Sequence, residues 1–328
     1  MNVRRLIPAT AVAAATALGL SALTACSSDS AAAGDSGNTS KFDVVASFYP
    51  MAYLAQQIGG EHVKVTSLTE PGQEPHDLEI SARQRAQLEE SDAALYLKGL
   101  QPTVDEAVDQ SGLKTKIDAA ELTSLEEHGT EVGGHAAEHD EHAGEEEGEE
   151  HEHEGGKDPH VWLDPVKYAE VAQGVGKAFE KADPDHAADY KKNTADLVAR
   201  LGALDTEFKT GLASTKTKVF ITTHAAFGYL AERYGLVEEA ISGLDPESEP
   251  SAARVKDLEK MAKADGVTTV FYETLVSDKT AKTIAKDANL GTDVLDPIEG
   301  ITDKSRGTDY FEVQKANLTA LRKALGAK

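Results

Sequence analysis

The sequence has 328 residues, a formal net charge of −24 and a single Cys. That length exceeds what one hydrophobic core usually serves, so we expect two lobes. The strong negative charge argues against nucleic acid as a partner. A single Cys excludes an internal disulfide, even in a compartment that would allow one.

The first 25 residues are typical of an export signal, because two Arg precede a run of small residues that is too weakly apolar to indicate a permanent membrane span. Cys26 follows directly, in "LTAC", and this stretch resembles a bacterial lipobox, whose Cys becomes the lipidated first residue of the mature protein. The alternative is an unmodified thiol just past the cleavage site. Residues 26–40 are rich in Ser, Gly and Ala and predict a flexible tether. We therefore expect an extracytoplasmic folded body from about Lys41, lipid-anchored to the outer face of the cell membrane.

Strands and helices alternate over the next part of the chain, which predicts a parallel α/β lobe. The first expected helix ends at Gly59 and Gly60. The expected strands lie at 42–48, 62–68, 93–99 and near 116, and the expected helices at 50–60, 81–91 and 102–112.

An acidic segment interrupts this pattern. Residues 126–154 contain thirteen acidic residues and no Lys or Arg, so more than half of the net charge falls there. Six of the eleven His also lie there: His128, His135, His139, His142, His151 and His153. Neutral imidazoles among carboxylates could form weak, exchangeable zinc sites, or the segment could be a solvated insertion with incidental His.

Two helices follow the acidic segment. The first is expected at 165–183, with Pro165 in its first turn, and "DPDH" breaks it. The second is expected at 186–214. It carries Leu or Phe at positions 197, 201, 204 and 208, a spacing typical of a core-facing stripe. Its length and mid-chain position indicate a helix that bridges the two lobes.

The last part of the chain repeats the strand–helix alternation and predicts a second parallel α/β lobe. The expected strands lie at 218–224, 237–243, 267–273 and 292–296, and the expected helices at 225–235, 251–266, 277–289 and 309–325. We therefore divide the chain into an export signal (1–25), a tether (26–40), a first lobe (41–164, with a disordered loop at 126–157), a helical segment (165–215) and a second lobe (216–328).

Five histidines lie outside the acidic segment. His62 and His186 stand in polar turns, which indicates surface positions. His224 and His76 follow strands, and His160 precedes a helix in "DPHVWLDP". Asp296 and Glu273 also follow strands, and ligands of open α/β sheets bind off the carboxyl ends of strands. Three His and a carboxylate suit a tetrahedral zinc site, but the spacing leaves open whether they converge or serve as helix caps.

Four stretches resemble the signature segments of one family: "EPHDLE", "DPHVWLDP", "ITTHAAFGYLAERYGL" and "VLDPIEG". They are similar to those of the metal-binding lipoproteins of ABC importers, in the zinc-uptake branch (the ZnuA/TroA-like family). The resemblance runs from about Phe42 to the end of the sequence. It implies two α/β lobes joined by one long helix, with Zn²⁺ in the cleft between them and only a small tilt on loading. It makes His76, His160 and His224 zinc ligands, with Asp296, a water or a loop residue in the fourth place.

The same resemblance implies what the protein does. It would be a monomeric zinc receptor that is not an enzyme and that delivers Zn²⁺ to an ABC permease with its ATPase subunit. Zinc members of this family often carry a His- and acid-rich insertion before the second ligand. Residues 126–157 would be that insertion, acting as an auxiliary zinc collector or sensor. Because zinc binds neutral imidazole, its affinity should fall below a pH of about 6.

Three alternatives stay open. A manganese or iron receptor of the same family is one, although manganese-type relatives carry a carboxylate at the position of His224 and imidazole suits zinc better. A zinc hydrolase is the second, with Glu273 as its base; otherwise Glu273 supports a ligand from behind. A zinc buffer or adhesin that works without a transporter is the third.

Overall fold

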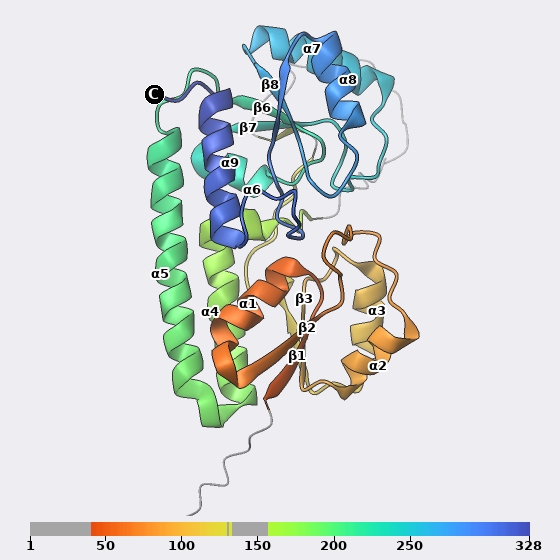
Figure 1. Cartoon of the computed structure of the whole chain (residues 1–328), viewed down its shortest axis with the longest axis vertical. Coiled ribbons are helices and arrows are strands. Elements are labelled where there is room, and N and C mark those ends of the chain that lie inside the picture. Colours follow the sequence, from red (N-terminus) through yellow and green to blue (C-terminus); the bar gives the residue numbers. More distant parts are fainter. Residues whose placement is uncertain (1–40, 130, 133–156) are drawn as a thin grey trace, which may run out of the picture. The chain divides into compact units, whose positions relative to one another are not determined.

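Two sheets form the frame of the protein (Figure 1). The structure is a computed structural model that describes residues 41–129, 131–132 and 157–328. In this part of the chain the first sheet has four parallel strands in the order β2-β1-β3-β4. They are β1 (Phe42–Ala46), β2 (Val63–Ser67), β3 (Ala93–Tyr96) and β4 (Thr115–Asp118). The first lobe is thus a parallel α/β unit, as predicted.

The second sheet has five strands within the described residues, in the order β5-β7-β6-β8-β9. They are β5 (Glu131–Val132), β6 (Val219–Thr222), β7 (Val237–Ala240), β8 (Thr269–Tyr272) and β9 (Gly291–Val294). Four of them are parallel, as predicted, but β5 runs antiparallel to β7 at the sheet edge. The acidic segment therefore contributes a short strand that the sequence pattern did not predict.

The helices of the described chain match the predicted ones in order and type. The first lobe has α1 (Tyr49–Gly59), α2 (Ala82–Glu90) and α3 (Pro102–Gln110); the middle segment has α4 (Pro165–Ala182) and α5 (Ala187–Leu212); the second lobe has α6 (Gly228–Tyr234), α7 (Ala252–Ala264), α8 (Lys279–Asp287) and α9 (Tyr310–Ala324). Short 3₁₀ turns lie at Gly60–His62, Ala119–Glu121, Val161–Leu163 and Pro184–His186.

Local chemistry explains where several helices begin and end. Ser81 and Gln84 form a capping box at the start of α2, in which each side chain bonds the other residue's backbone N–H. Asp164 accepts a hydrogen bond from the N–H of Val166 at 2.8 Å and so caps α4. Gly235 has a φ of 62° and ends α6 in the left-handed conformation that glycine adopts at low cost.

The long helix α5 ties the lobes together. It packs along α4, and it also contacts α1 of the first lobe and α9 of the second (Figure 1). Its predicted apolar stripe is buried: Leu197, Leu201, Leu204 and Phe208 are each at most 2% exposed. This confirms the expectation of a core-facing helix that links two lobes.

One hydrophobic cluster runs through both lobes, since it joins residues of β1 and α1 to residues of α5, β6 and α9. Trp162 is fully buried in it, and its indole N–H donates to the carbonyl of Pro297 at 2.7 Å. Tyr310 in turn donates to the carbonyl of Trp162 at 2.6 Å. The turn before α4 is therefore fixed to the loop that follows β9.

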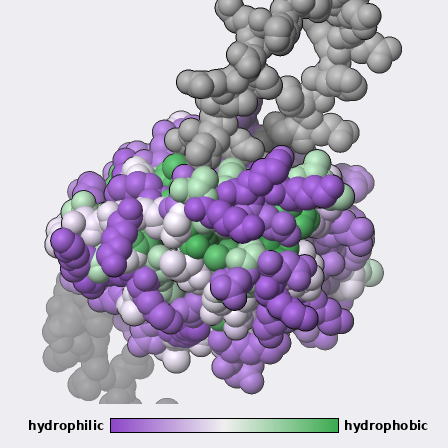
Figure 2. All heavy atoms as spheres, turned by 90° about the horizontal axis from the view of Figure 1, so that it is seen from above, coloured by the Kyte–Doolittle hydropathy of each residue, from purple (hydrophilic) through white to green (hydrophobic). Residues whose placement is uncertain are grey.

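The outer helices of the second lobe are polar on their free side. Helix α7 buries only Leu258 and Ala262, and the face seen in Figure 2 is mostly hydrophilic, with hydrophobic residues visible between polar ones.

Within residues 41–129, 131–132 and 157–328, no helix combines the length and apolar character needed to cross a membrane. The predicted export signal, Cys26 and the tether lie outside the described residues.

Candidate metal centre

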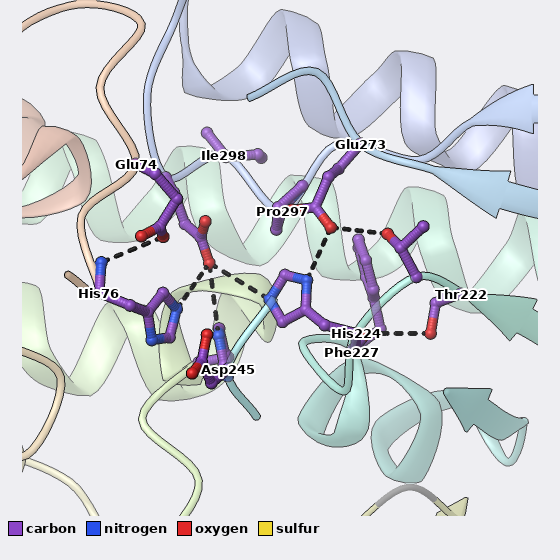
Figure 3. A network of polar contacts seen from close by, with 12 residues as sticks. Glu74, His76, Thr222, His224, Phe227, Asp245, Glu273, Pro297 and Ile298 are labelled. Carbon is purple, nitrogen blue, oxygen red and sulfur yellow. Dashed lines mark hydrogen bonds and ion pairs between the residues drawn. The ribbon is translucent and has the colours of Figure 1, made fainter. Parts of the chain in front are cut away.

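Four side chains from separate parts of the chain meet between the lobes. His76, His160, His224 and Glu299 each direct one ligand atom into a group whose members all lie within 4.8 Å of one another. We call this group the interlobe centre. Figure 3 shows His76 and His224 reaching it from opposite sides, and their ring centroids are 5.9 Å apart. The structure thus brings the three predicted histidines together.

The distances within the interlobe centre suit a tetrahedral zinc ion. One oxygen of Glu299, Oε1, lies 3.3 Å from His76 Nε2, 3.4 Å from His160 Nε2 and 3.5 Å from His224 Nε2. A tetrahedral zinc ion about 2.0–2.1 Å from each ligand separates any two ligand atoms by about 3.4 Å. The three distances from Glu299 to the imidazoles therefore already match the spacing that such an ion requires.

Each histidine reaches the centre from a different element. His224 comes two residues after β6, which ends at Thr222, so its position follows from the carboxyl end of a parallel strand. His160 starts the short turn that leads into α4. His76 lies in the loop after β2, where Glu74 accepts hydrogen bonds from the N–H groups of His76 and Asp77 at 3.0 and 3.2 Å.

Two carboxylates orient the histidine rings from behind. Asp158 Oδ1 lies 2.7 Å from Nδ1 of His160, and Glu273 Oε1 lies 2.9 Å from Nδ1 of His224. A carboxylate on Nδ1 holds the proton there and leaves the Nε2 lone pair free for a metal. Thr223 also donates to Glu273 at 2.6 Å and fixes that carboxylate.

The four side chains of the interlobe centre are almost completely buried. The side chains of His160 and Glu299 are 0% exposed, that of His224 is 2% exposed and that of His76 is 11% exposed. Among the described residues, Nε2 of His160, Nε2 of His224 and the second oxygen of Glu299 are buried without a hydrogen-bond partner. Buried polar atoms normally have partners, and the two unpaired imidazole nitrogens, which both lie beside Oε1 of Glu299, are placed where a metal ion would satisfy them.

The charges of the centre shift the protonation of its members. Burial alone would lower the pKa of His160, but the charge and hydrogen bond of Asp158 outweigh it and raise that pKa to about 8. Burial alone would likewise lower the pKa of His224, but the charge and hydrogen bond of Glu273 outweigh burial and hold that pKa well above its ordinary value. Burial would raise the pKa of Glu299, yet the three imidazoles around it hold that pKa well below the usual range. Without metal, protons therefore compensate the negative charge of Glu299.

Asp296, the residue expected in the fourth place, does not join this group. Its Oδ1 accepts from the N–H of Ile298 at 2.8 Å, and its Oδ2 accepts from the hydroxyl of Thr274 at 3.1 Å. Its backbone is held on both sides by the side-chain amide of Asn317. Asp296 therefore organises the loop after β9, and Glu299, three residues on, is the carboxylate that this loop presents.

Sequence reasoning missed Glu299 because the strand-end rule favours the residue nearest the strand. The intervening turn is what brings Glu299 to the centre, and no sequence pattern marks it. Ile298 has a φ of 60°, a conformation that is rare for a β-branched residue and that tends to occur where function requires it. Among the acidic residues of "VLDPIEG", only Glu299 lies beyond this turn.

The remaining predicted residues lie elsewhere. His62 and His186 stack on each other, with ring centroids 4.1 Å apart, and both are partly exposed outside the centre. His128 is described and lies against Asp158. The other five histidines of the acidic segment lie outside the described residues: His135, His139, His142, His151 and His153.

Comparison with known proteins points to one family. Residues 44–324 match the sequence model of the family described as "ZnuA: Zinc-uptake complex component A periplasmic". The chain is 36% identical to the zinc-binding protein AdcA of Streptococcus pyogenes serotype M3 over 286 residues, which cover 86% of this chain and 56% of AdcA. The chain thus spans about half the length of that relative. It is 34% identical to the high-affinity zinc uptake system protein ZnuA of Bacillus subtilis over 310 residues, covering 93% of this chain and 94% of that protein.

Solved structures agree with the fold. The Zn(II)-bound ZnuA-like domain of Streptococcus pneumoniae AdcA superposes with a TM-score of 0.69 at 31% identity, covering 87% of this chain and 99% of that domain. The laminin-binding protein Lmb of Streptococcus agalactiae, described as bifunctional with adhesin and metal transporting activity, gives a TM-score of 0.73 at 28% identity, covering 87% and 98% of the two chains. The chain therefore belongs to the ZnuA family of periplasmic zinc-uptake components.

Proposed function

We propose that this protein captures Zn²⁺ outside the cytoplasm and delivers it to an ABC-type permease for zinc uptake. The observation that carries this proposal is the interlobe centre, in which Oε1 of Glu299 lies 3.3–3.5 Å from the Nε2 atoms of three imidazoles, close to the distance of about 3.4 Å between two ligand atoms of tetrahedral zinc. His76, His160 and His224 would be zinc ligands, with Glu299 as the fourth. Glu273 and Asp158 would hold two of the rings in position.

The ligand set favours zinc over manganese. Manganese prefers a shell of oxygen atoms, whereas imidazole nitrogen suits zinc, and three of the four atoms here are nitrogen. The set also argues against a hydrolase, because catalytic zinc sites keep one position open for water or substrate. Here four protein side chains point to one place and at most 11% of any of them is exposed.

Release of the ion would involve the two lobes. His76 belongs to the first lobe, while His224 and Glu299 belong to the second. A small tilt that withdraws His76, the most exposed of the four, would open the tetrahedron. The core shared between the lobes and the bond from Trp162 to Pro297 favour such a tilt over a wide hinge motion.

A zinc titration by calorimetry, with manganese as a control, tests the proposed cargo. One tight zinc site is expected, and it should disappear in His160→Ala and His224→Ala but not in His62→Ala. Equal or tighter manganese binding would instead favour the manganese receptor. Cells that lack the protein should also grow poorly when zinc is chelated and recover when zinc is added; unchanged growth would argue for a buffer or adhesin.

Three further parts of the proposal concern how the protein works in the cell. Cys26 would carry a lipid that holds the protein, as a monomer, at the outer face of the membrane. The permease would act with an ATPase subunit. The acidic segment would collect zinc or sense it. Because β5 and His128 belong to the folded lobe, a deletion that tests the segment should remove residues 133–156 only. Unchanged zinc stoichiometry and loading rate after that deletion would show that the segment is a solvated insertion.

A further inference from the structure

A second group of potential metal ligands lies at the root of the acidic segment. Glu126, His128 and Glu232 bring one ligand atom each to within 4.8 Å of one another. We call them the outer cluster. Glu126 and His128 belong to the chain that enters the acidic segment, and Glu232 projects from α6. The backbone N–H of Asp158 donates to the carbonyl of Glu126 at 2.8 Å, so the two ends of the segment are joined beside this cluster.

His128 is seated in a way that an incidental histidine of a low-complexity run would not be. Its ring stands edge-on to the ring of Tyr229, with centroids 4.5 Å apart, and its side chain is only 7% exposed. The ring lies so close to α6 that a Cβ added at Gly228 would be 2.6 Å from its atoms. Glycine at this position therefore makes room for His128.

The contacts of His128 leave its outer nitrogen facing the two glutamates. Asp158 Oδ2 lies 2.7 Å from Nδ1, so the Nδ1 proton is held there. Nε2 lies 3.3 Å from Glu232 Oε2, again close to the edge of about 3.4 Å expected between ligands of tetrahedral zinc. This is the arrangement of His160, with a carboxylate behind the ring and another in front.

The charge around His128 is suited to a divalent cation. Asp158, Glu126 and Glu232 face it. Lys167, the cation paired with this group among the described residues, lies 2.6 Å from Oε1 of Glu126. The nearby Arg233 is engaged by Asp164. When His128 is neutral, Lys167 offsets Glu126 and His160 shares Asp158, so the negative charge of Glu232 is left for a cation.

We propose that Glu126, His128 and Glu232 form a second zinc site, weaker and more exchangeable than the interlobe centre. Three protein ligands leave room for water in the coordination shell, and Glu126 and Glu232 are 40% and 59% exposed. This site deepens the proposed collection of zinc by the acidic segment, because it names residues that would hold the ion, and it stands whether or not the protein serves a permease.

The two sites share one carboxylate. Asp158 is buried and holds Nδ1 of His160 through Oδ1 and Nδ1 of His128 through Oδ2. Zinc at either histidine is therefore supported by the same side chain, and a change at Asp158 should affect both sites. Glu273 stands behind His224 alone, so its loss should affect the interlobe centre only.

The experiment uses the full chain with the five other histidines of the acidic segment replaced by Asn, so that they contribute no zinc sites. Zinc is titrated by calorimetry, and the ring nitrogens of ¹⁵N-labelled His are followed by NMR. A tight step that shifts His76, His160 and His224 should be followed by a weaker step that shifts His128. A titration without a second step, or with one that leaves the His128 signals unchanged, overturns the second site.

Substitutions then separate the two sites. Glu232→Gln and His128→Asn should weaken the second step at least tenfold and spare the first, whereas Glu273→Gln should weaken the first by about 10–100-fold and spare the second. Asp158→Asn should weaken both. His62→Asn is the matched control and should change neither.

Glu232 is an exposed side chain, so its variant tests the site without threatening the fold; an unchanged second step in Glu232→Gln contradicts the proposal. Loss of the tight step alone would refute the proposed function and leave this site standing.

Discussion

The interlobe centre and the outer cluster are built from the same parts and differ in burial. Each has an imidazole with Asp158 behind it and a glutamate in front of it. At the interlobe centre the glutamate is 0% exposed, whereas Glu232 of the outer cluster is 59% exposed. A buried carboxylate has no water to stabilise it and depends on a cation or on donors, while an exposed one keeps its hydration. Burial, more than the choice of residues, should therefore set how tightly each site holds zinc.

The two clusters also differ in which parts of the chain supply them. The interlobe centre takes His76 from one lobe and His224 and Glu299 from the other, so motion between the lobes can change its geometry. The outer cluster pairs α6 with the chain segment fixed against it. We therefore expect a tilt of the lobes to open the first site and to leave the second site intact, and the following predictions test how independent the two sites are.

The largest effect should come from removing the buried carboxylate. Glu299→Ala deletes a ligand that lies 3.3–3.5 Å from all three imidazoles. Zinc affinity should fall by more than the roughly 10–100-fold that loss of a supporting partner causes. Competition with a chromogenic chelator measures the change.

The paired variant is Asp296→Ala, which loosens the loop after β9 without removing one of the four clustered side chains. A smaller loss, of about tenfold, is expected together with a lower melting temperature. An equal or larger loss in Asp296→Ala than in Glu299→Ala would restore Asp296 to the fourth place.

Glu299 and Asp296 show which features of the site can be predicted from the sequence and which cannot. Hydrophobic runs and strand–helix alternation predicted both lobes, and the strand-end rule brought attention to His224 and Glu273, because these positions depend on local periodicity. The fourth carboxylate depends instead on a turn through Ile298 at a φ of 60°, held by Asp296 and Asn317. Such a turn results from tertiary contacts, and a propensity pattern does not reveal it.

The root of the acidic segment teaches the same lesson. Strand β5 has two residues inside a low-complexity run, too few for a period-2 pattern. His128 looks like five other histidines in the sequence, and what distinguishes it is a seat made by Gly228 and Tyr229, about one hundred residues away. Composition described the segment as a whole and could not single out the residues that fold against the lobe.

The next effect concerns pH, and it has opposite signs with and without metal. The pKa of His160 is raised to about 8, because the charge of Asp158 outweighs burial. A raised histidine pKa stabilises the metal-free fold below the unfolded value of about 6.5, and this contribution is lost as the pH rises through about 8. Zinc requires neutral imidazole, so protons compete with it. As the pH is lowered, the apparent zinc affinity should fall about tenfold per pH unit for each proton that zinc displaces, beginning near pH 8 rather than near pH 6.

Melting temperatures with and without excess zinc check both signs at once. Metal-free protein should lose stability between about pH 6.5 and pH 8.5, while the rise in melting temperature caused by zinc should grow over the same range. A zinc-induced rise that is the same at both ends of the range would mean that these histidines bind zinc without releasing protons.

A smaller effect should be confined to the outer cluster. Gly228→Ala places a Cβ 2.6 Å from the ring of His128 and must push that ring out of its seat. The second zinc step should weaken by about tenfold, comparable with the loss of a supporting partner, and the first should be unchanged. The NMR shift of His128 on zinc addition reports the outcome; a weakened first step would mean that the seat of His128 also supports the interlobe centre.

The smallest effect should come from the contact that fixes the two loops of the interlobe centre to each other. Trp162→Phe keeps the aromatic packing and removes the hydrogen bond from the indole N–H to the carbonyl of Pro297, two residues before Glu299. A buried carbonyl left unpaired costs about 1–3 kcal/mol, which lowers the melting temperature by a few degrees. Zinc affinity should fall only severalfold, because all four ligand side chains remain. If affinity fell as far as in Glu299→Ala, the position of Glu299 would depend on Trp162 more than on the turn through Ile298, and the rigidity of the centre would come from the core between the lobes rather than from the loop itself.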